Sequence, residues 1–246
     1  MRLKRSPTTR TSRAAGRAPQ APPAARPRRK NAREYTSPAR LGRIFAALDA
    51  LFPRAECALH HRNAFQLLIA TILSAQCTDE RVNKVTPGLF VKYPSPQDFG
   101  AVHQEVLEQD IRSTGFFRNK AKSIIGASKI LVARFGGAVP RAMDELLTLP
   151  GVARKTANVV LGTAYGIASG VVVDTHVFRI ARRLKLTRAK TPEKVEQDLM
   201  RIVPRERWIG FSHQVIWFGR KICQARRPLC ASCPLEPLCD APDKTV

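Results

Sequence analysis

The sequence contains no long apolar run, little glycine and few acidic residues, and each shortage excludes a class of protein. A membrane-spanning helix needs about 18 or more consecutive apolar residues, and the chain has no such run, so we do not expect a transmembrane protein. Its 14 glycines in 246 residues are too few for a collagen-like repeat. The N-terminus lacks the apolar core of a secretory signal peptide, and we therefore expect a cytoplasmic protein.

Acidic residues number 19 against 42 lysines and arginines, which leaves a formal net charge of +23. An excess of this size predicts a polyanionic partner, either nucleic acid or an anionic membrane surface. The alternative is a charge that only keeps the protein in solution. Hydrophobic residues make up 44% of the chain, which is ordinary for a globular protein and excludes a mostly disordered one.

The excess charge is concentrated in residues 1–40, which hold twelve basic residues, six prolines and a single acidic residue, Glu34. With almost no large apolar side chains, this segment cannot bury enough surface to offset the entropy cost of ordering. We therefore predict a disordered basic arm over residues 1–40. Three roles fit its composition: contacts to DNA phosphates, an organelle transit peptide, or a plain basic tail.

Four of the six cysteines lie near the C-terminus with the spacing C-x6-C-x2-C-x5-C, namely Cys223, Cys230, Cys233 and Cys239. Since no signal peptide is evident, disulfides are a weaker explanation than a tetrathiolate metal site. Zinc and a [4Fe–4S] cluster both suit four thiolates. Structural zinc usually shows two close C-x2-C pairs, so the single close pair here favours the cluster, with zinc as the alternative. Cys57 and Cys77 are isolated, and we expect buried core cysteines there.

Apolar residues recur at three- and four-residue intervals through most of the remaining chain, which predicts helices. The one strand-like run, residues 171–173, is short and has no partner, so we predict an all-α fold. The expected helices cover residues 41–52, 64–74, 82–91, 98–110, 120–135, 143–149, 154–165, 175–184, 192–203 and 211–222.

A tight turn separates two of these helices in the segment LPGVARKTA, residues 149–157. A Pro-Gly turn before a helix directs backbone N–H groups toward one point at the positive helix N-terminus, which forms a phosphate site without sequence preference. An ordinary connection between two helices is the alternative. The two basic residues directly after the turn, Arg154 and Lys155, favour the phosphate site.

Lys155 and Asp174 are the candidate catalytic residues. An amine is nucleophilic only when neutral, and both the Arg154 cation and the helix N-terminus disfavour the protonated form of Lys155. Such a lysine suits Schiff-base chemistry at C1′ of a sugar; a surface lysine that binds phosphate is the alternative. Asp174 follows the valine run and is either a helix N-cap or a carboxylate that stabilises an oxocarbenium-like sugar or takes a proton from Lys155.

Three motifs in this order resemble the endonuclease III family of DNA glycosylases, which belongs to the helix-hairpin-helix superfamily. They are LPGVARKTANVV from Leu149, VDTHVFRIARR from Val173, and the four-cysteine spacing. The segments LSAQCTD at residues 73–79 and GFFRNKA at residues 115–121 are similar as well. The similarity extends from about Leu41 to Cys239 and leaves out only the arm and the last residues.

The resemblance implies an all-α protein of two domains with DNA in the cleft between them. A six-helix domain would span residues 57–167, and an iron–sulfur domain would combine residues 41–56 with residues 168–246. The implied activity is that of a bifunctional DNA glycosylase and class I AP lyase. Such an enzyme removes oxidised pyrimidines, such as thymine glycol, from duplex DNA and cuts the abasic site by β-elimination. We expect a monomer that acts on damaged double-stranded DNA and has no membrane partner.

The resemblance also assigns residues to roles. By position, Lys155 matches the family's nucleophile and Asp174 its catalytic carboxylate. Gln76 matches the residue that fills the gap left by the flipped nucleotide, and Phe116 lies where the family places a wedge beside the lesion. A [4Fe–4S] cluster is implied for Cys223, Cys230, Cys233 and Cys239, and DNA contacts are implied for Gly151, Ala153, Arg154, His176, Arg226 and Arg227.

Some features depart from the family pattern. Ala153 stands where glycine is commonest, which is acceptable only if its φ is negative. The connection from Lys155 to Asp174 is one residue longer than in some members, and the loop at residues 167–170 is expected to absorb the difference. Three other classes are a non-catalytic DNA-binding protein, an electron-transfer protein and a monofunctional adenine or mismatch glycosylase. The presence of Lys155 favours the lyase over the last of these.

Overall fold

The structure, a computed structural model, describes residues 32–245, and every regular element in them is a helix. This confirms the all-α fold expected from the sequence. The chain divides into two units, residues 1–30 and residues 31–246, and only the second is described here. Most of the predicted basic arm therefore lies outside the described residues. In the described part, no helix is long and apolar enough to cross a membrane.

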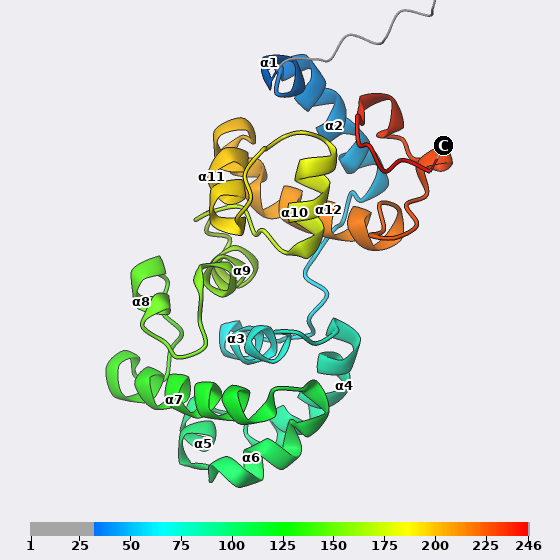
Figure 1. Cartoon of the computed structure of the whole chain (residues 1–246). Coiled ribbons are helices and arrows are strands. Elements are labelled where there is room, and N and C mark those ends of the chain that lie inside the picture. Colours follow the sequence, from blue (N-terminus) through cyan, green and yellow to red (C-terminus); the bar gives the residue numbers. More distant parts are fainter. Residues whose placement is uncertain (1–31, 246) are drawn as a thin grey trace, which may run out of the picture. The chain divides into compact units, whose positions relative to one another are not determined.

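Helices follow one another through the whole described range, joined by turns and by longer loops such as the one between α2 and α3 (Figure 1). In chain order they are α1 (Ala32–Tyr35), α2 (Pro38–Leu51), α3 (Ala64–Leu73), α4 (Asp79–Lys92), α5 (Pro96–Ala101), α6 (Gln104–Asp110), η1 (Arg112–Thr114), α7 (Phe117–Phe135), α8 (Met143–Leu147), α9 (Arg154–Tyr165), α10 (Thr175–Arg183), α11 (Pro192–Ile202), η2 (Arg205–Arg207), α12 (Trp208–Lys221), η3 (Cys230–Ser232) and η4 (Glu236–Leu238), where η marks a 3-10 helix.

The first two helices correct the expected extent of the basic arm. Residues 32–40 form α1 and the start of α2, and both Tyr35 and Arg40 are buried. The Arg40 guanidinium donates hydrogen bonds to the carbonyls of Leu184 (2.8 Å) and Leu238. The prediction of disorder is therefore wrong for residues 32–40. Amino-acid composition does not predict these helices, because it does not show which arginine will donate hydrogen bonds to carbonyls that are distant in the sequence.

Two separate groups of buried side chains form the core of the described residues. One comes from residues 59–161, and the other combines residues 41–48 with residues 171–238. Figure 1 shows α3 to α8 on one side and α2, α10, α11 and α12 on the other, with α9 between them. The division of the chain into a six-helix domain and an iron–sulfur domain stays a prediction.

Helix α3 is the centre of the first core group. Asn63 caps its N-terminus by accepting a hydrogen bond from the backbone N–H of Gln66 (2.9 Å), and eight of its ten residues are buried. Because α3 is apolar on nearly every side, it must be surrounded by other helices. Helices α4, α7 and α9 pack against it.

The second core group is built around α10 and α12, with α2 packed on α12. The valine run at residues 171–173 enters this group as a buried extended segment. The N–H of Val172 donates to Oγ of Ser212 (3.0 Å), so a serine on α12 provides the partner that a neighbouring strand would otherwise supply. The segment ends at Asp174, where α10 begins.

One predicted helix is interrupted. The periodicity of the sequence predicts a single helix over residues 98–110, whereas the structure has α5 and α6 there. Ser95 and Asp98 form a reciprocal capping box, so α5 begins at Pro96. Val102 and His103 then adopt extended backbone conformations, with ψ of 141° and 137°, and the chain turns before α6.

Candidate active site and cysteine pocket

A cleft with a volume of about 740 Å³ is lined by segments from both core groups. The turn after α3, the first turns of α9 and α10, and one face of α12 all contribute to its walls. Four predicted site residues line it: Gln76, Lys155, Asp174 and His176. Residues that are 98 positions apart in the sequence, Gln76 and Asp174, therefore meet at one concave surface.

The turn before α9 has the backbone that its sequence predicts. Gly151 has a φ of +78°, and a Cβ atom there would lie 2.7 Å from Cβ of Ser123 on α7, so glycine is required. Ala153 is the N-cap of α9 with a φ of −93° and a ψ of 170°. This confirms that alanine is acceptable where the family prefers glycine, because the backbone is extended and not left-handed.

Lys155 lies in the first turn of α9, where its side chain is exposed and lines the cleft. Val159, four residues later, lines the cleft too. Positions four apart lie on one face of a helix, so the face of α9 that carries Lys155 forms part of the cleft wall.

Asp174 is the N-cap of α10. One carboxylate oxygen, Oδ1, accepts hydrogen bonds from the backbone N–H groups of His176 and Val177, each at 2.8 Å. The capping interpretation of Asp174 is therefore correct, and Asp174 also lines the cleft that the catalytic candidate Lys155 lines. Two hydrogen bonds to rigid backbone hold the carboxylate in one orientation toward the helix.

His176 is confined between α10 and α12. A Cβ atom on Gly219 would lie 2.9 Å from both Cβ and Nδ1 of His176, so only glycine leaves room for the ring. Burial lowers the pKa of His176, and the nearby Asp174 carboxylate partly opposes the shift. The Arg179 guanidinium lies 3.3 Å from Nδ1 and can only donate.

Gln76 and Phe116 both have left-handed backbones, with φ of 53° and 47°. For a residue with a Cβ atom, the left-handed conformation is roughly 1–2 kcal/mol less favourable than the right-handed one. Bulky aromatic residues rarely adopt it. Gln76 follows α3, and Phe116 immediately precedes α7 with 66% of its surface exposed. Strained residues of this kind gather at functional sites.

A buried network that the sequence analysis missed holds Arg154. Glu196 on α11 has a side chain only 8% exposed, and it accepts hydrogen bonds from Nε of Arg154 (2.9 Å) and from Nδ2 of Asn158 (2.8 Å). The loop before the valine run passes close by, since a Cβ atom on Gly170 would lie 2.1 Å from Oε1 of Glu196. The burial of Glu196 could have been predicted from the spacing, because Glu196 lies between the buried positions Val195 and Leu199 of one helix.

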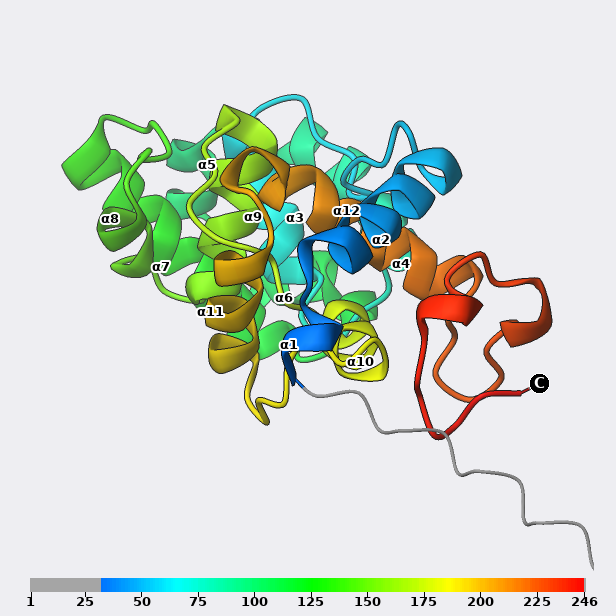
Figure 2. The same cartoon turned by 90° about the horizontal axis from the view of Figure 1, so that it is seen from above.

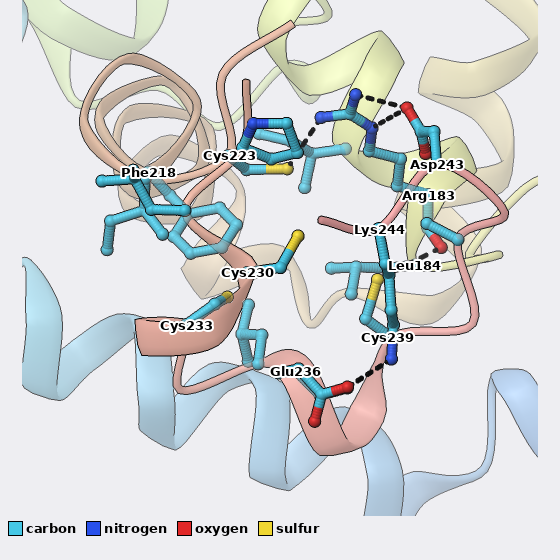
Figure 3. A pocket seen from close by; sticks show the side chains of 16 residues that line it. Arg183, Leu184, Phe218, Cys223, Cys230, Cys233, Glu236, Cys239, Asp243 and Lys244 are labelled. Carbon is cyan, nitrogen blue, oxygen red and sulfur yellow. Dashed lines mark hydrogen bonds and ion pairs between the residues drawn. The ribbon is translucent and has the colours of Figure 1, made fainter. Parts of the chain in front are cut away.

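The four C-terminal cysteines face a single pocket from different sides (Figure 3). Their segment follows the end of α12 and packs against α10 (Figure 2). Apolar side chains such as Phe218 and Leu184 line the same pocket. Burial raises the pKa of the Cys233 and Cys239 thiols. None of the six cysteines forms a disulfide, and no three His, Cys, Asp or Glu side chains of the described residues are grouped as a single metal ion would require.

Arg183 on α10 joins this pocket to the loop that follows α12. Its side chain is 9% exposed and donates from Nη1 to Sγ of Cys223 (3.2 Å). It also donates to the carbonyls of Gln224 (2.7 Å) and Ala225 (3.0 Å) and pairs with Asp243. No sequence pattern predicts these contacts of Arg183, because its partners lie at least 40 residues away in the sequence.

Arg226 and Arg227 are exposed in the loop between Cys223 and Cys230. The predicted DNA-contacting residues thus fall into four places: the cleft, the turn before α9, this loop, and the start of α7. Phe116 is exposed at the last of these.

Comparisons with known proteins agree on one family. Residues 69–205 match the model of the HhH-GPD superfamily of base excision DNA repair proteins. Endonuclease III of Synechocystis sp. is 55% identical over 80% of this chain and 90% of its own length, and endonuclease III of Bacillus subtilis is 53% identical over 77% and 86%. A solved structure of a trapped endonuclease III–DNA covalent intermediate is similar with a TM-score of 0.78 and 49% identity, covering 82% of this chain and 95% of that one.

Proposed function

Since this chain belongs to the endonuclease III family of DNA glycosylases in base excision repair, we propose that it is bifunctional and removes oxidised pyrimidines from duplex DNA. The same site would then cut the resulting abasic site. The observation that carries the proposal is that Lys155 and Asp174 line one cleft, in a chain whose relatives include an endonuclease III trapped covalently on DNA.

The first step needs an unpaired nucleotide in the cleft. A base in a duplex is inaccessible, so it must be flipped out at a cost of a few kcal/mol, and a damaged pyrimidine that stacks poorly lowers this cost. Gln76 would fill the gap that the nucleotide leaves, and Phe116 would wedge beside it. The turn with Gly151 and Ala153, at the positive end of α9, would bind backbone phosphate.

Lys155 is the proposed nucleophile. Its neutral amine attacks C1′ of the sugar while the bond from C1′ to the base breaks, and the base leaves with the bonding electron pair. Asp174 would stabilise the positive charge that develops on the sugar. It would also accept the proton that the nitrogen of Lys155 loses.

The second step is the lyase reaction. The lysine adduct opens the sugar ring to an imine between Nζ of Lys155 and C1′, and this imine acidifies the proton on C2′. Removal of that proton expels the 3′ phosphate by breaking the C3′–O bond, so the strand is cut on the 3′ side of the lesion. Water then hydrolyses the imine and restores the amine.

We propose a [4Fe–4S] cluster in the cysteine pocket. Four sulfurs arranged around an apolar pocket (Figure 3) suit a cluster in which each thiolate binds its own iron, whereas a zinc ion would hold all four at about 2.3 Å from one centre. Cys223, Cys230, Cys233 and Cys239 would be the ligands. When bound, the cluster would crosslink the C-terminal segment and present the loop of Arg226 and Arg227 to the DNA backbone.

The domain arrangement is proposed on the same basis. Residues 57–167 would form the six-helix domain, and residues 41–56 with residues 168–246 would form the iron–sulfur domain. The two core groups support this division. Damaged DNA would bind to a single copy of the chain along the cleft.

Borohydride trapping tests the activity. The purified protein is incubated with a duplex that contains one thymine glycol, and borohydride reduces any imine to a stable protein–DNA adduct. We expect an adduct with the wild type and none with Lys155→Ala. Lys194→Ala, which removes an exposed lysine from α11, is the matched control and should be trapped like the wild type.

Two results would contradict the proposal. Released base without an adduct would mean a monofunctional glycosylase, and neither base nor adduct would refute the oxidised-pyrimidine assignment. Iron and sulfide analysis tests the cluster separately. We expect about four irons for each chain, lost in Cys230→Ser and retained in Cys57→Ser, since Cys57 lies in the cleft and outside the cysteine pocket.

A further inference from the structure

Lys120 is a buried lysine with an unusual pair of partners. Only 5% of the residue is exposed. The ammonium donates hydrogen bonds to the carbonyls of Leu73 and Thr114, each at 2.7 Å. Burial lowers the pKa of this amine. Lys120 is absent from the ion pairs of the described residues, so backbone carbonyls are what compensate its charge.

The two carbonyls belong to segments that are far apart in the sequence. Leu73 is the last residue of α3, and Thr114 is the last residue of η1. Carbonyls at a helix end have no partner within the helix, so a donor from elsewhere can bind them. Lys120 therefore ties the end of one helix to the end of another.

Each tied segment leads directly to a strained residue. Gln76 is three residues after Leu73, and Phe116 is two residues after Thr114. These two, together with Lys185, are the residues other than glycine that have a positive φ in the described part of the chain. Lys120 thus holds both turns that carry the side chains proposed to enter the duplex.

The turn with Phe116 is held at a second point. The backbone N–H of Lys120 donates to the carbonyl of Phe116 (3.1 Å), in the first turn of α7. Thr114 is itself fixed, since it is 2% exposed and its hydroxyl donates to the carbonyl of Ile111 (2.8 Å). A movement of Phe116 would consequently strain contacts to both the main chain and the side chain of Lys120.

From this geometry we infer that Lys120 is a positioning residue that sets the separation of Gln76 and Phe116, so that both can enter the DNA together when the nucleotide flips. The inference rests on the proposed function. Burying an ammonium is costly, and an apolar side chain would fill the same space more cheaply. A lysine here is explained by its ability to bind two carbonyls at once, which no apolar residue can do.

The test separates flipping from chemistry. Lys120→Met keeps a long unbranched side chain and removes the donors, while Lys122→Met removes an equal charge from an exposed position of the same helix and is the matched control. Each protein is trapped with borohydride on two substrates: a duplex with one thymine glycol, and a single strand with one abasic site. The single strand needs no flipping, so it reports on Lys155 alone.

We expect the single-turnover rate of Lys120→Met on the duplex to fall about tenfold or more, because the two turns lose charge-assisted hydrogen bonds. Its rate on the single strand should stay within about twofold of the wild type, and Lys122→Met should match the wild type on both substrates. Should Lys120→Met not fold, Lys120→Gln replaces it. This variant keeps one NH₂ group, and we expect a smaller loss that is again confined to the duplex.

Other results would overturn the inference. Equal losses on both substrates would show that Lys120 only supports the fold, and an unchanged duplex rate would show that it positions nothing. If the wild type itself forms an adduct on neither substrate, the proposed function has failed, and the inference falls with it.

Discussion

Replacement of Gly170 by alanine would test the buried network that holds Arg154, the neighbour of the proposed nucleophile Lys155. The added Cβ atom would lie 2.1 Å from Oε1 of Glu196 and 2.8 Å from Nδ2 of Asn158. Atoms that do not bond to each other cannot approach so closely, so the Glu196 carboxylate must move. This movement would lengthen or break its hydrogen bonds to Arg154 and Asn158.

The size of the effect follows from these contacts. A hydrogen bond to a charged group is worth about 1.5–3 kcal/mol, and forcing an extra methyl group into a packed interior costs about 1–3 kcal/mol. Arg154 is 45% exposed and can turn toward water, so its bond contributes least. We expect a loss of about 3 kcal/mol in the free energy of unfolding, which lowers the melting temperature by about 6–12 °C in a domain of this size.

The assay is thermal unfolding followed by circular dichroism at one fixed heating rate. Gly42→Ala is the matched control, because a Cβ atom at Gly42 meets nothing within 4 Å and Gly42 lies inside α2. Alanine there should leave the melting temperature unchanged or raise it, since alanine is preferred to glycine in helices by about 0.5–1 kcal/mol.

The double variant Gly170→Ala with Glu196→Ala identifies the contact responsible. If the clash is with Glu196, the two losses will not add, because removing the carboxylate removes most of the cost of the new methyl group. A Gly170→Ala protein that melts within about 2 °C of the wild type, less than the shift for 1 kcal/mol, would refute this reasoning about the loop and α11.

Other predictions concern the cleft, the core and the N-terminal segment. Asp174→Asn should reduce the single-turnover rate of base release about 100-fold or more without lowering the melting temperature, because asparagine is also a good N-cap. Arg40→Met should lower the free energy of unfolding in urea by about 2–4 kcal/mol, since buried carbonyls would lose their donor. Burial lowers the pKa of His176 and of His213, so the unfolded chain binds more protons as pH falls from about 6.5 toward the lowered values. Stability in urea should therefore decline over that interval, and His213→Asn should flatten the decline. Deletion of residues 1–31 should weaken DNA binding and reduce the slope of log affinity against log salt, as measured by filter binding at several salt concentrations.

The local sequence pattern predicted the structure correctly where the conformation of a segment depends only on its own residues. The turn at residues 149–153 has a glycine at a φ of +78°, and α9 begins at Arg154 as expected. Asp174 caps α10, which its position before a helical segment predicted. These features depend on residues within a few positions of one another, so the sequence contains all the information they require.

Pattern was a poorer guide where a particular hydrogen bond, distant or local, outweighs average composition or periodicity. Residues 32–40 have a composition typical of disorder, yet Arg40 is buried because Leu184 and Leu238 present carbonyls to it. Residues 98–110 have helical periodicity, yet a capping box at Ser95 shifts the start of α5 and the chain turns at Val102. Hydrogen bonds to distant carbonyls therefore order residues 32–40, and a local capping box sets where α5 begins.

The sequence by itself determined the all-α class, the two catalytic candidates and the four cysteines, because each is recorded in residue types at short, regular spacings. The tertiary structure alone decided that Gln76, Lys155, Asp174 and His176 share one cleft. It alone revealed Glu196 beneath Arg154, Arg183 against Cys223, and Lys120 between the turns of Gln76 and Phe116. The reason is physical: a buried charge is tolerated only where partners from distant segments converge on it, and that convergence arises when the chain folds.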